Sequence, residues 1–220
     1  MPSIADTQVA VRNPAWLAAP LAGVMFGASL IAFAAVRTDG YTHGTKAVSE
    51  LGAVGAPSAL AFNLLAFIVP GLLVAWFGVV LARCADNKVG PSLLAGSGLL
   101  VAMAGTFPFD LGNVAALTTI GHAIGVVGSG LLWVIALFWM GSLFSRHFGL
   151  SRWGRITPWF ALFLFVHIAW QATFQITALV LPGYGQRIGF FGYFLWLAVS
   201  GMLLWSRGAR SNTTGKAQLQ

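Results

Sequence analysis

Charged residues are scarce in this chain: only 8% of its 220 residues are Asp, Glu, Lys or Arg, whereas 58% are hydrophobic. A soluble domain typically carries about 25% charged residues. So few charges cannot coat a globule of this size, which excludes a soluble monomer and a separate soluble domain. Cysteine is scarcer still, since Cys84 stands alone. A single cysteine excludes both an internal disulfide and a cysteine-based metal cluster.

What the chain has instead is a series of long apolar runs. A membrane-spanning helix needs about 20 apolar residues, and charges, prolines and glycines divide the chain into six such segments. The expected spans are residues 14–36, 58–82, 91–108, 119–144, 159–181 and 188–206. The first is too long for the core of a signal peptide, so we expect it to be retained. The sequence therefore predicts an all-α, polytopic membrane protein, a single bundle of six transmembrane helices with residues 207–220 as a short tail.

The net charge of +7 comes from basic residues that are distributed unevenly across the predicted membrane. The outer face carries three of them: Arg37, Lys46 and Arg187. The side of the chain ends carries the other nine: Arg12, Arg83, Lys88, Arg146, Arg152, Arg155, Arg207, Arg210 and Lys216. Because basic loops stay in the cytoplasm, this asymmetry predicts cytoplasmic N- and C-termini. The basic residues are thus topology signals, and we expect no nucleic-acid partner.

Tryptophans predict the same orientation, because amphipathic indole rings favour the headgroup zone of a membrane. Six of them fall at the predicted cytoplasmic ends of the spans: Trp16, Trp76, Trp139, Trp153, Trp159 and Trp205. The two independent signals agree on which side of the membrane holds the chain ends.

The loop at residues 38–57 is about 20 residues long, whereas connections between packed helices usually have about 2–8. Within it, the apolar pattern of residues 45–51 predicts a short helix that lies over the bundle in the membrane interface. Ser49 and Glu50 lie off its apolar face, and we take both as candidate ligand-binding residues. A structural role is equally open. In it, Ser58 caps the second span, and the dipole at the N-terminus of that helix stabilises the nearby Glu50 carboxylate.

Asp110 follows the third span, at or just outside the membrane boundary. A carboxylate at this depth needs a partner, because an unpaired charge there costs several kcal/mol. His122, about one turn into the fourth span, and Arg187, before the sixth, are the expected partners. In an enzyme, His122 would be the general acid or base, Asp110 would orient it, and Glu50 or Arg187 would handle developing charge. A structural ion pair between two loops is the open alternative.

The fifth predicted span carries three polar side chains at intervals of four residues: His167, Gln171 and Gln175. Residues at this spacing share one face of a helix. Lipid offers them no hydrogen-bond partner, so they must face the bundle or a wet cavity. Asn63 in the second span is expected to face the same interior. Hydrogen bonds between helices and the wall of an outward-opening cavity both stay open as interpretations.

Cofactor chemistry finds little support in the sequence. A haem held between His122 and His167 is disfavoured, because their predicted depths differ by about 12 Å at the helical rise per residue. No HxxxH or CxxC spacing predicts zinc. Ser49 lacks the Gly-x-Ser-x-Gly elbow of a nucleophilic serine. We therefore expect no cofactor and no metal site.

One stretch of the chain resembles a known family. Residues 48–53 read Val-Ser-Glu-Leu-Gly-Ala, and Pro57 and Asn63 follow. This resembles the bacterial membrane proteins grouped as the domain-of-unknown-function 998 family, which have six helices and a Ser-Glu-Leu-Gly loop before the second span. The likeness continues in Phe-Pro-Phe-Asp at 107–110, Gly-His at 121–122 and Gly-Gln-Arg at 185–187. The resemblance implies the fold and shared positions, but no established reaction.

The chain departs from the family pattern at Phe109, where a polar residue or a cysteine often stands. This departure argues against metal chemistry at that position.

Together these features predict a bacterial inner-membrane protein whose outward-facing polar pocket binds a lipid or small amphiphile. The expected ligand-binding residues are Ser49, Glu50, Asn63, Asp110, His122, His167, Gln171, Gln175 and Arg187. The rival hypothesis is an intramembrane enzyme that acts on a lipophilic substrate or biosynthetic intermediate with His122, Asp110 and Glu50. A transporter is less favoured, because the segments show no inverted repeat and no paired broken helices. The expected partner is a membrane lipid or a lipophilic small molecule, and nothing in the sequence identifies a protein partner.

Overall fold

The chain is built from helices joined by short connections and two longer loops. The computed structural model describes residues 13–177 and 182–217, without the side chains of 168–177, 182 and 208–217, and the described part contains no strand. The elements are the 3-10 helix η1 (Pro14–Leu17), α2 (Ala18–Ala35), the 3-10 helix η2 (Val48–Gly52), α3 (Ala59–Phe62), the π-helix η3 (Asn63–Ile68), α4 (Val69–Cys84), α5 (Val89–Thr106), α6 (Leu117–Arg146), α7 (Ser151–Thr177) and α8 (Pro182–Ala217). Because α3, η3 and α4 follow one another directly, they form one continuous rod.

Among the described residues, five helical segments are long and apolar enough to cross a membrane: Pro14–Ala35, Ala59–Cys84, Val89–Thr106, Leu117–Arg146 and Gly183–Arg207. Their outward surfaces carry apolar side chains such as Val24, Leu72 and Phe191, which suits contact with lipid rather than water. The predicted fold class, a polytopic helical membrane bundle, is confirmed.

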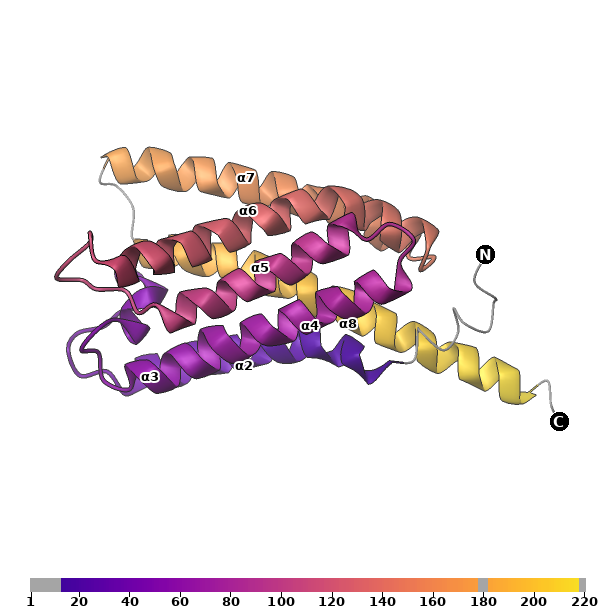
Figure 1. Ribbon diagram of the computed structural model, residues 1–220, viewed down its shortest axis with the longest axis horizontal. Helices are drawn as coiled ribbons and strands as arrows, with labels where there is room; N and C mark the ends of the chain where they lie inside the picture. Colours follow the sequence, from indigo (N-terminus) through magenta and orange to yellow (C-terminus); the bar gives the residue numbers. More distant parts are fainter. Residues whose placement is uncertain (1–12, 178–181, 218–220) are drawn as a thin grey trace.

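The rods run side by side along the long axis of the molecule (Figure 1). Around the bundle the packing order is α2, α4, α5, α6, α7 and α8, and α8 packs back on α2. One end of the bundle, at the left of Figure 1, carries η2 and the loop of residues 107–116; we call it the η2 end. The other carries the short connections at residues 85–88 and 147–150 and is called the turn end. Both η1 and the last residues of α8 lie at the turn end.

Small residues let neighbouring helices approach closely. Gly71 on α4 and Gly98 on α5 face each other so tightly that a Cβ on either would meet backbone atoms of the other helix. Gly125 on α6 lies equally close to the backbone of α5 at Leu100 and Ala104. Close backbone approach of this kind replaces the hydrophobic driving force that helices lack inside lipid.

Two helices extend beyond their predicted spans. α7 begins at Ser151 instead of residue 159, so Arg152 and Arg155 lie on its first turns. Tight packing supports this early start, because a Cβ on Gly154 would meet the backbone of α6 at Gly141. The second helix is α8, which continues to Ala217 through residues that were predicted as a tail.

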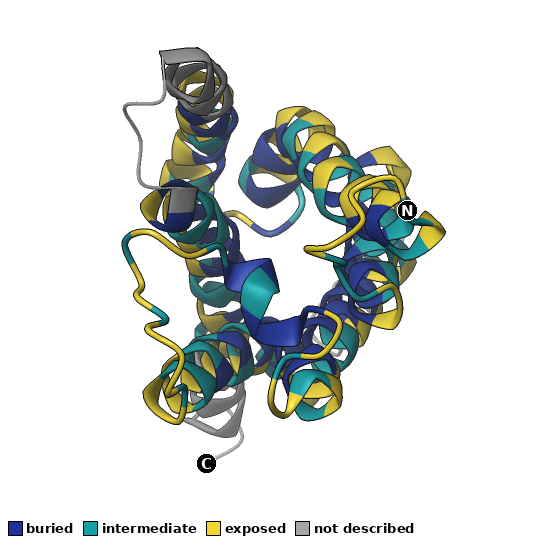
Figure 2. Cartoon of the chain, turned by 90° about the vertical axis from the view of Figure 1, so that its left-hand side faces the viewer, coloured by how far each residue is buried: buried dark blue, intermediate teal, exposed yellow. Residues whose placement is uncertain are grey.

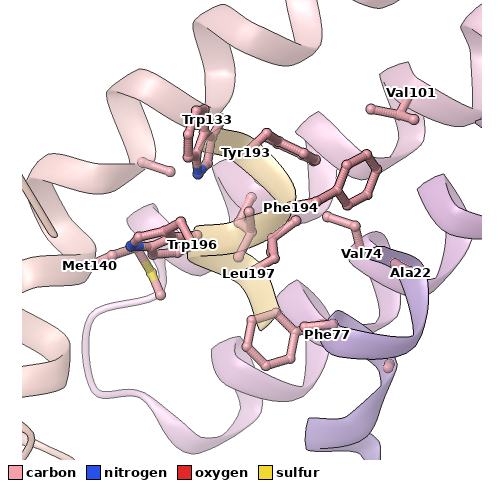
Figure 3. Packing of buried hydrophobic residues seen from close by; sticks show 14 of the residues in the cluster. Ala22, Val74, Phe77, Val101, Trp133, Met140, Tyr193, Phe194, Trp196 and Leu197 are labelled. Carbon is pink, nitrogen blue, oxygen red and sulfur yellow. The ribbon is translucent and has the colours of Figure 1, made fainter. Parts of the chain in front are cut away.

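Large aromatic side chains fill the core between the helices. In its central part, Trp133 of α6 packs edge-on against Tyr193 of α8, with 4.9 Å between ring centroids (Figure 3). Trp16 is also fully buried and packs edge-on against Phe77 and Phe148. Its ring is therefore enclosed by protein, whereas the prediction had it facing the headgroup zone.

Candidate functional site

The loop between α2 and α3 turns inward at η2. Val48, Ser49, Leu51 and Gly52 are buried. Figure 2, which looks onto the η2 end, shows this short and largely buried helix near the centre of the bundle. A short helix was expected over residues 45–51 in the membrane interface. It lies instead inside the end of the bundle, where it covers the bundle interior.

Hydrogen bonds at both of its faces hold η2 in place. Glu50 Oε1 accepts the backbone N–H of Ala47 at 2.9 Å, and Glu50 Oε2 lies 3.4 Å from Lys46 Nζ. From α8, the side-chain oxygen of Gln186 accepts the backbone N–H of Val48 at 2.8 Å. Gln186 was not among the predicted ligand-binding residues, although it stands in the Gly-Gln-Arg stretch that carries part of the family resemblance.

The predicted capping of the second span by Ser58 is wrong, whereas Glu50 has a structural role of another kind. Ser58 has a left-handed backbone with φ of 60° and makes no side-chain capping bond. The Glu50 carboxylate satisfies the N-terminus of η2, three residues back along its own chain, which is the shorter reach and the smaller loss of entropy.

Asn63 joins η2 to the rod formed by α3, η3 and α4 through a hydrogen bond. Its Nδ2 donates to the carbonyl oxygen of Gly52 at 2.8 Å, and its side chain is buried. Residue 52 must be glycine, because a Cβ there would overlap the amide of Asn63. Of the two predicted interpretations, a hydrogen bond between helices or a cavity wall, Asn63 therefore fits the first.

Arg187 at the start of α8 holds the loop ahead of η2. Its Nε donates to His43 Nδ1 at 3.1 Å, and its Nη1 donates to the carbonyls of Lys46 at 2.9 Å and Gly183 at 2.8 Å. Its Nη2 donates to the Tyr41 hydroxyl at 2.5 Å. We call these contacts the Arg187 clamp. Every acceptor in the clamp is uncharged, so the guanidinium acts here through geometry rather than through an ion pair.

The other charges of this loop are paired locally. Arg37 forms a two-pronged ion pair with Asp39, and the hydrogen bonds from Arg37 lower the pKa of the Asp39 carboxyl to about 2. The same hydrogen bonds raise the pKa of Arg37. At His43, burial and the nearby charge of Arg187 lower the pKa of the imidazole. His43 is therefore neutral near pH 7, as an acceptor from Arg187 must be.

Asp110 is held by its own loop. Its Oδ1 accepts the backbone N–H groups of Gly112 at 2.9 Å and Asn113 at 3.2 Å. Across the described part of the chain, no hydrogen bond or ion pair joins Asp110 to His122 or Arg187. The predicted pairing is wrong, because amides two and three residues away form an Asx turn with the carboxylate at little entropic cost.

His122 is oriented by the C-terminal end of α5. Its Nδ1 lies 2.9 Å from the carbonyl oxygen of Ala104 and 3.1 Å from that of Phe107. Carbonyls only accept hydrogen bonds, so Nδ1 carries the proton and Nε2 of the neutral ring is left as an acceptor. Within the described residues Nε2 has no hydrogen-bond partner. The rings of Phe67 and Phe109 stand edge-on around this imidazole.

A cavity of about 390 Å³ lies behind η2, and we call it the first cavity. Ser49, Glu50 and His122, three of the predicted site residues, line it together with Gln186. Its other walls are aromatic or aliphatic: Ala47, Phe67, Phe109, Leu111, Ala123, Val126, Val127 and Phe190. Its size and its few polar groups are typical of small-molecule sites. The predicted residues Asn63, Asp110 and Arg187 are not among those that line it.

A second cavity, of about 410 Å³, adjoins the first. It is lined from α5, α6, α7 and α8 and shares four residues with the first cavity: Val126, Val127, Gln186 and Phe190. His167 lines the second cavity and bonds to the backbone of Gly185. The predicted site residues Gln171 and Gln175 lie outside the described side chains. The structure thus divides the predicted pocket into two adjacent spaces.

This arrangement defines a polytopic helical membrane protein with a loop helix set into one end of its bundle and two cavities behind it. The chain belongs to the family described as "Protein of unknown function (DUF998)", whose model matches residues 21–203. The predicted family resemblance is confirmed. Comparison with curated proteins and with solved structures finds no match. In the described residues, no group of three His, Cys, Asp or Glu side chains could hold a metal ion.

Proposed function

We propose that this protein binds a lipid or small amphiphile in the first cavity. The observation that carries the proposal is His122: two carbonyls hold its Nδ1–H, which leaves Nε2 as an acceptor in a largely apolar chamber. Nε2 is not among the enclosed, unpartnered atoms of the described residues, so it is accessible and can accept a hydrogen bond from a ligand. A ligand that brings one polar group and much apolar surface would satisfy it.

Binding is favoured over catalysis by the position of Asp110. The enzyme hypothesis needs this carboxylate to orient His122, and Asp110 bonds to Gly112 and Asn113 instead. The two carbonyls that do orient His122 bear no negative charge and would stabilise an imidazolium far less than a carboxylate. The surroundings of His122 therefore fit a binding role better than a general base.

The test is ligand retention during purification in a mild detergent, measured by mass spectrometry of an organic extract. Wild type is expected to retain a lipid or amphiphile, and His122→Ala is expected to lose most of it. His147→Ala is the matched control, because it removes a histidine of similar chemistry at the turn end of the same helix. Equal retention by both variants, or no retained compound in wild type, would overturn the proposal.

We also propose that the chain resides in a bacterial inner membrane with both ends in the cytoplasm. Support comes from the excess of basic residues on the side of the chain ends, nine against three, since basic loops stay inside. A C-terminal alkaline phosphatase fusion is expected to be inactive, and the same reporter inserted after Gly40 in the η2-end loop is expected to be active. The reverse pattern would contradict the orientation.

A further inference from the structure

Two of the polar groups around the first cavity only accept hydrogen bonds. Glu50 is a carboxylate already paired with Lys46, and His122 presents Nε2 as an acceptor. Ser49 is buried, lines the cavity, and its hydroxyl makes no hydrogen bond within the described residues. The Gln186 side-chain oxygen is occupied by Val48. The Ser49 hydroxyl can donate as well as accept, and the side-chain NH2 of Gln186 makes no hydrogen bond within the described residues. The Glu50 carboxylate and His122 Nε2 only accept, so a head group beside these two must donate a hydrogen bond, as a hydroxyl or an amine does and a carboxylate does not.

Most polar atoms around the second cavity are already engaged, and the exceptions within the described residues are the enclosed N–H of Trp133 and the side-chain NH2 of Gln186. The Ser129 hydroxyl donates to the carbonyl of Val126 at 2.7 Å, and the Tyr193 hydroxyl bonds to Ser97 at 3.0 Å. His167 bonds to the backbone of Gly185. Trp133 turns its ring against Tyr193, as Figure 3 shows, and its N–H is fully enclosed by protein. The space that remains is apolar and suits hydrocarbon.

We propose that the two cavities form one divided site for an amphiphile with a hydrogen-bond-donating head and a hydrocarbon chain. The head, a hydroxyl or an amine, lies against Glu50 and His122, and the chain passes Phe190 into the second cavity beside Trp133. The shared wall residues place the two spaces next to each other, which is what a continuous ligand requires. This inference rests on the proposed function and adds the class of ligand to it.

The head group is tested with two probes that share a brominated chain, 11-bromoundecan-1-ol and 11-bromoundecanoate, added to the protein in phosphatidylcholine nanodiscs at pH 8. Bromine quenches a tryptophan that it touches, so the signal is the quenching present in wild type and absent in Trp133→Phe. Phenylalanine keeps an aromatic ring there and removes an N–H that has no acceptor. We expect the alcohol to bind at least about tenfold more tightly than the carboxylate, because Glu50 repels the latter. Equal binding or a preference for the carboxylate would overturn the head-group assignment.

The chain position is tested by filling the second cavity from Gly130. This glycine lines the second cavity, and no atom lies within 4 Å of where its Cβ would stand. Gly130→Leu is expected to weaken binding of 11-bromoundecan-1-ol about tenfold or more. Gly27→Leu is the matched control, because Gly27 has equal open space on α2 and lines neither cavity.

These outcomes separate the inference from the function on which it rests. If Gly130→Leu binds like wild type, or if Trp133→Phe is quenched as strongly as wild type, the hydrocarbon chain does not occupy the second cavity. Binding of an amphiphile in the first cavity would then still stand, provided that His122→Ala loses the retained compound. If His122→Ala also retains it, the proposed function fails and the divided site fails with it.

Discussion

The η2 end and the turn end of the bundle close in different ways. At the turn end the connections are short, and buried rings such as Trp16 and Phe148 pack the space between the helices. At the η2 end a long loop folds into the bundle, and Asn63 and Arg187 donate hydrogen bonds to it while Gln186 accepts one from it. Close packing of side chains opposes separation of the helices at the turn end, whereas the few hydrogen bonds at the η2 end can break together and let the loop move. For the ligand proposed above, the comparison predicts access at the η2 end.

The charges follow the same division. Arg37, Glu50 and Arg187 at the η2 end each make hydrogen bonds that hold the loop. At the turn end, Arg83 lies over the ring of Trp76, and Asp86 reaches only His147 at 3.8 Å. Among the described charges at the turn end, Arg207 alone makes a hydrogen bond to a connection, through the Phe148 carbonyl at 3.0 Å. Charge therefore builds more of the local structure at the η2 end than at the turn end.

The largest expected effect tests the packing of the turn end. Trp16→Ala should destabilise the protein by about 3 kcal/mol or more, because truncation of a fully buried tryptophan leaves a cavity that the surrounding rings cannot fill. Denaturant unfolding in detergent micelles measures the change. Trp159→Ala is the control, since Trp159 is 66% exposed on the surface of α7, and it should change stability little. Similar effects of the two variants would mean that Trp16 does not pack as the structure shows.

The second prediction concerns the Arg187 clamp. Arg187→Gln removes the guanidinium that joins Tyr41, His43 and Lys46 to α8. We expect the loop at residues 41–50 to lose about 1–2 kcal/mol of protection in amide hydrogen exchange, because each such bond is partly exposed to solvent. Global stability should fall less than in Trp16→Ala.

Arg83→Gln is the matched control for the clamp at the turn end. Arg83 stacks on Trp76 but makes no hydrogen bond within the described residues, so its loss should leave exchange at residues 41–50 unchanged. If Arg187→Gln exchanges like Arg83→Gln, the clamp does not hold the loop and the contrast between the two ends disappears.

The sequence predicts the helices better than it predicts the candidate site. Apolar runs predict the helical bundle because lipid requires it of any spanning segment. Ser49, Glu50 and His122, which were predicted to share one pocket, line the first cavity because their segments share one end of the bundle. The depth of η2 was not predictable, because it depends on Asn63 and Gln186 finding backbone groups far along the chain.

The failed pairings share one physical cause, which is competition from nearby backbone. Asp110 and Glu50 both satisfy amides within three residues of themselves, and His122 finds carbonyls left free at the end of α5. A rule that pairs opposite charges at similar depth overlooks these local donors and acceptors. The burial of Trp16 was not predictable either, because it depends on contacts with Phe77 and Phe148 far along the chain.

The smallest expected effect is a pH dependence confined to the η2 end. The pKa of His43 is lowered from its ordinary value of 6.5 by burial and by Arg187, so the free loop binds more protons than the clamped loop in the pH range just below 6.5. The contribution of His43 to the clamp is therefore complete above that range and is lost as the pH falls through it. We expect hydrogen-exchange protection of residues 41–50, corrected for intrinsic rates, to be lower at pH 5.5 than at pH 7.5. His43→Gln keeps an uncharged acceptor for Arg187 at both pH values and should abolish the difference, whereas a difference that persists in this variant would assign the pH dependence to another group.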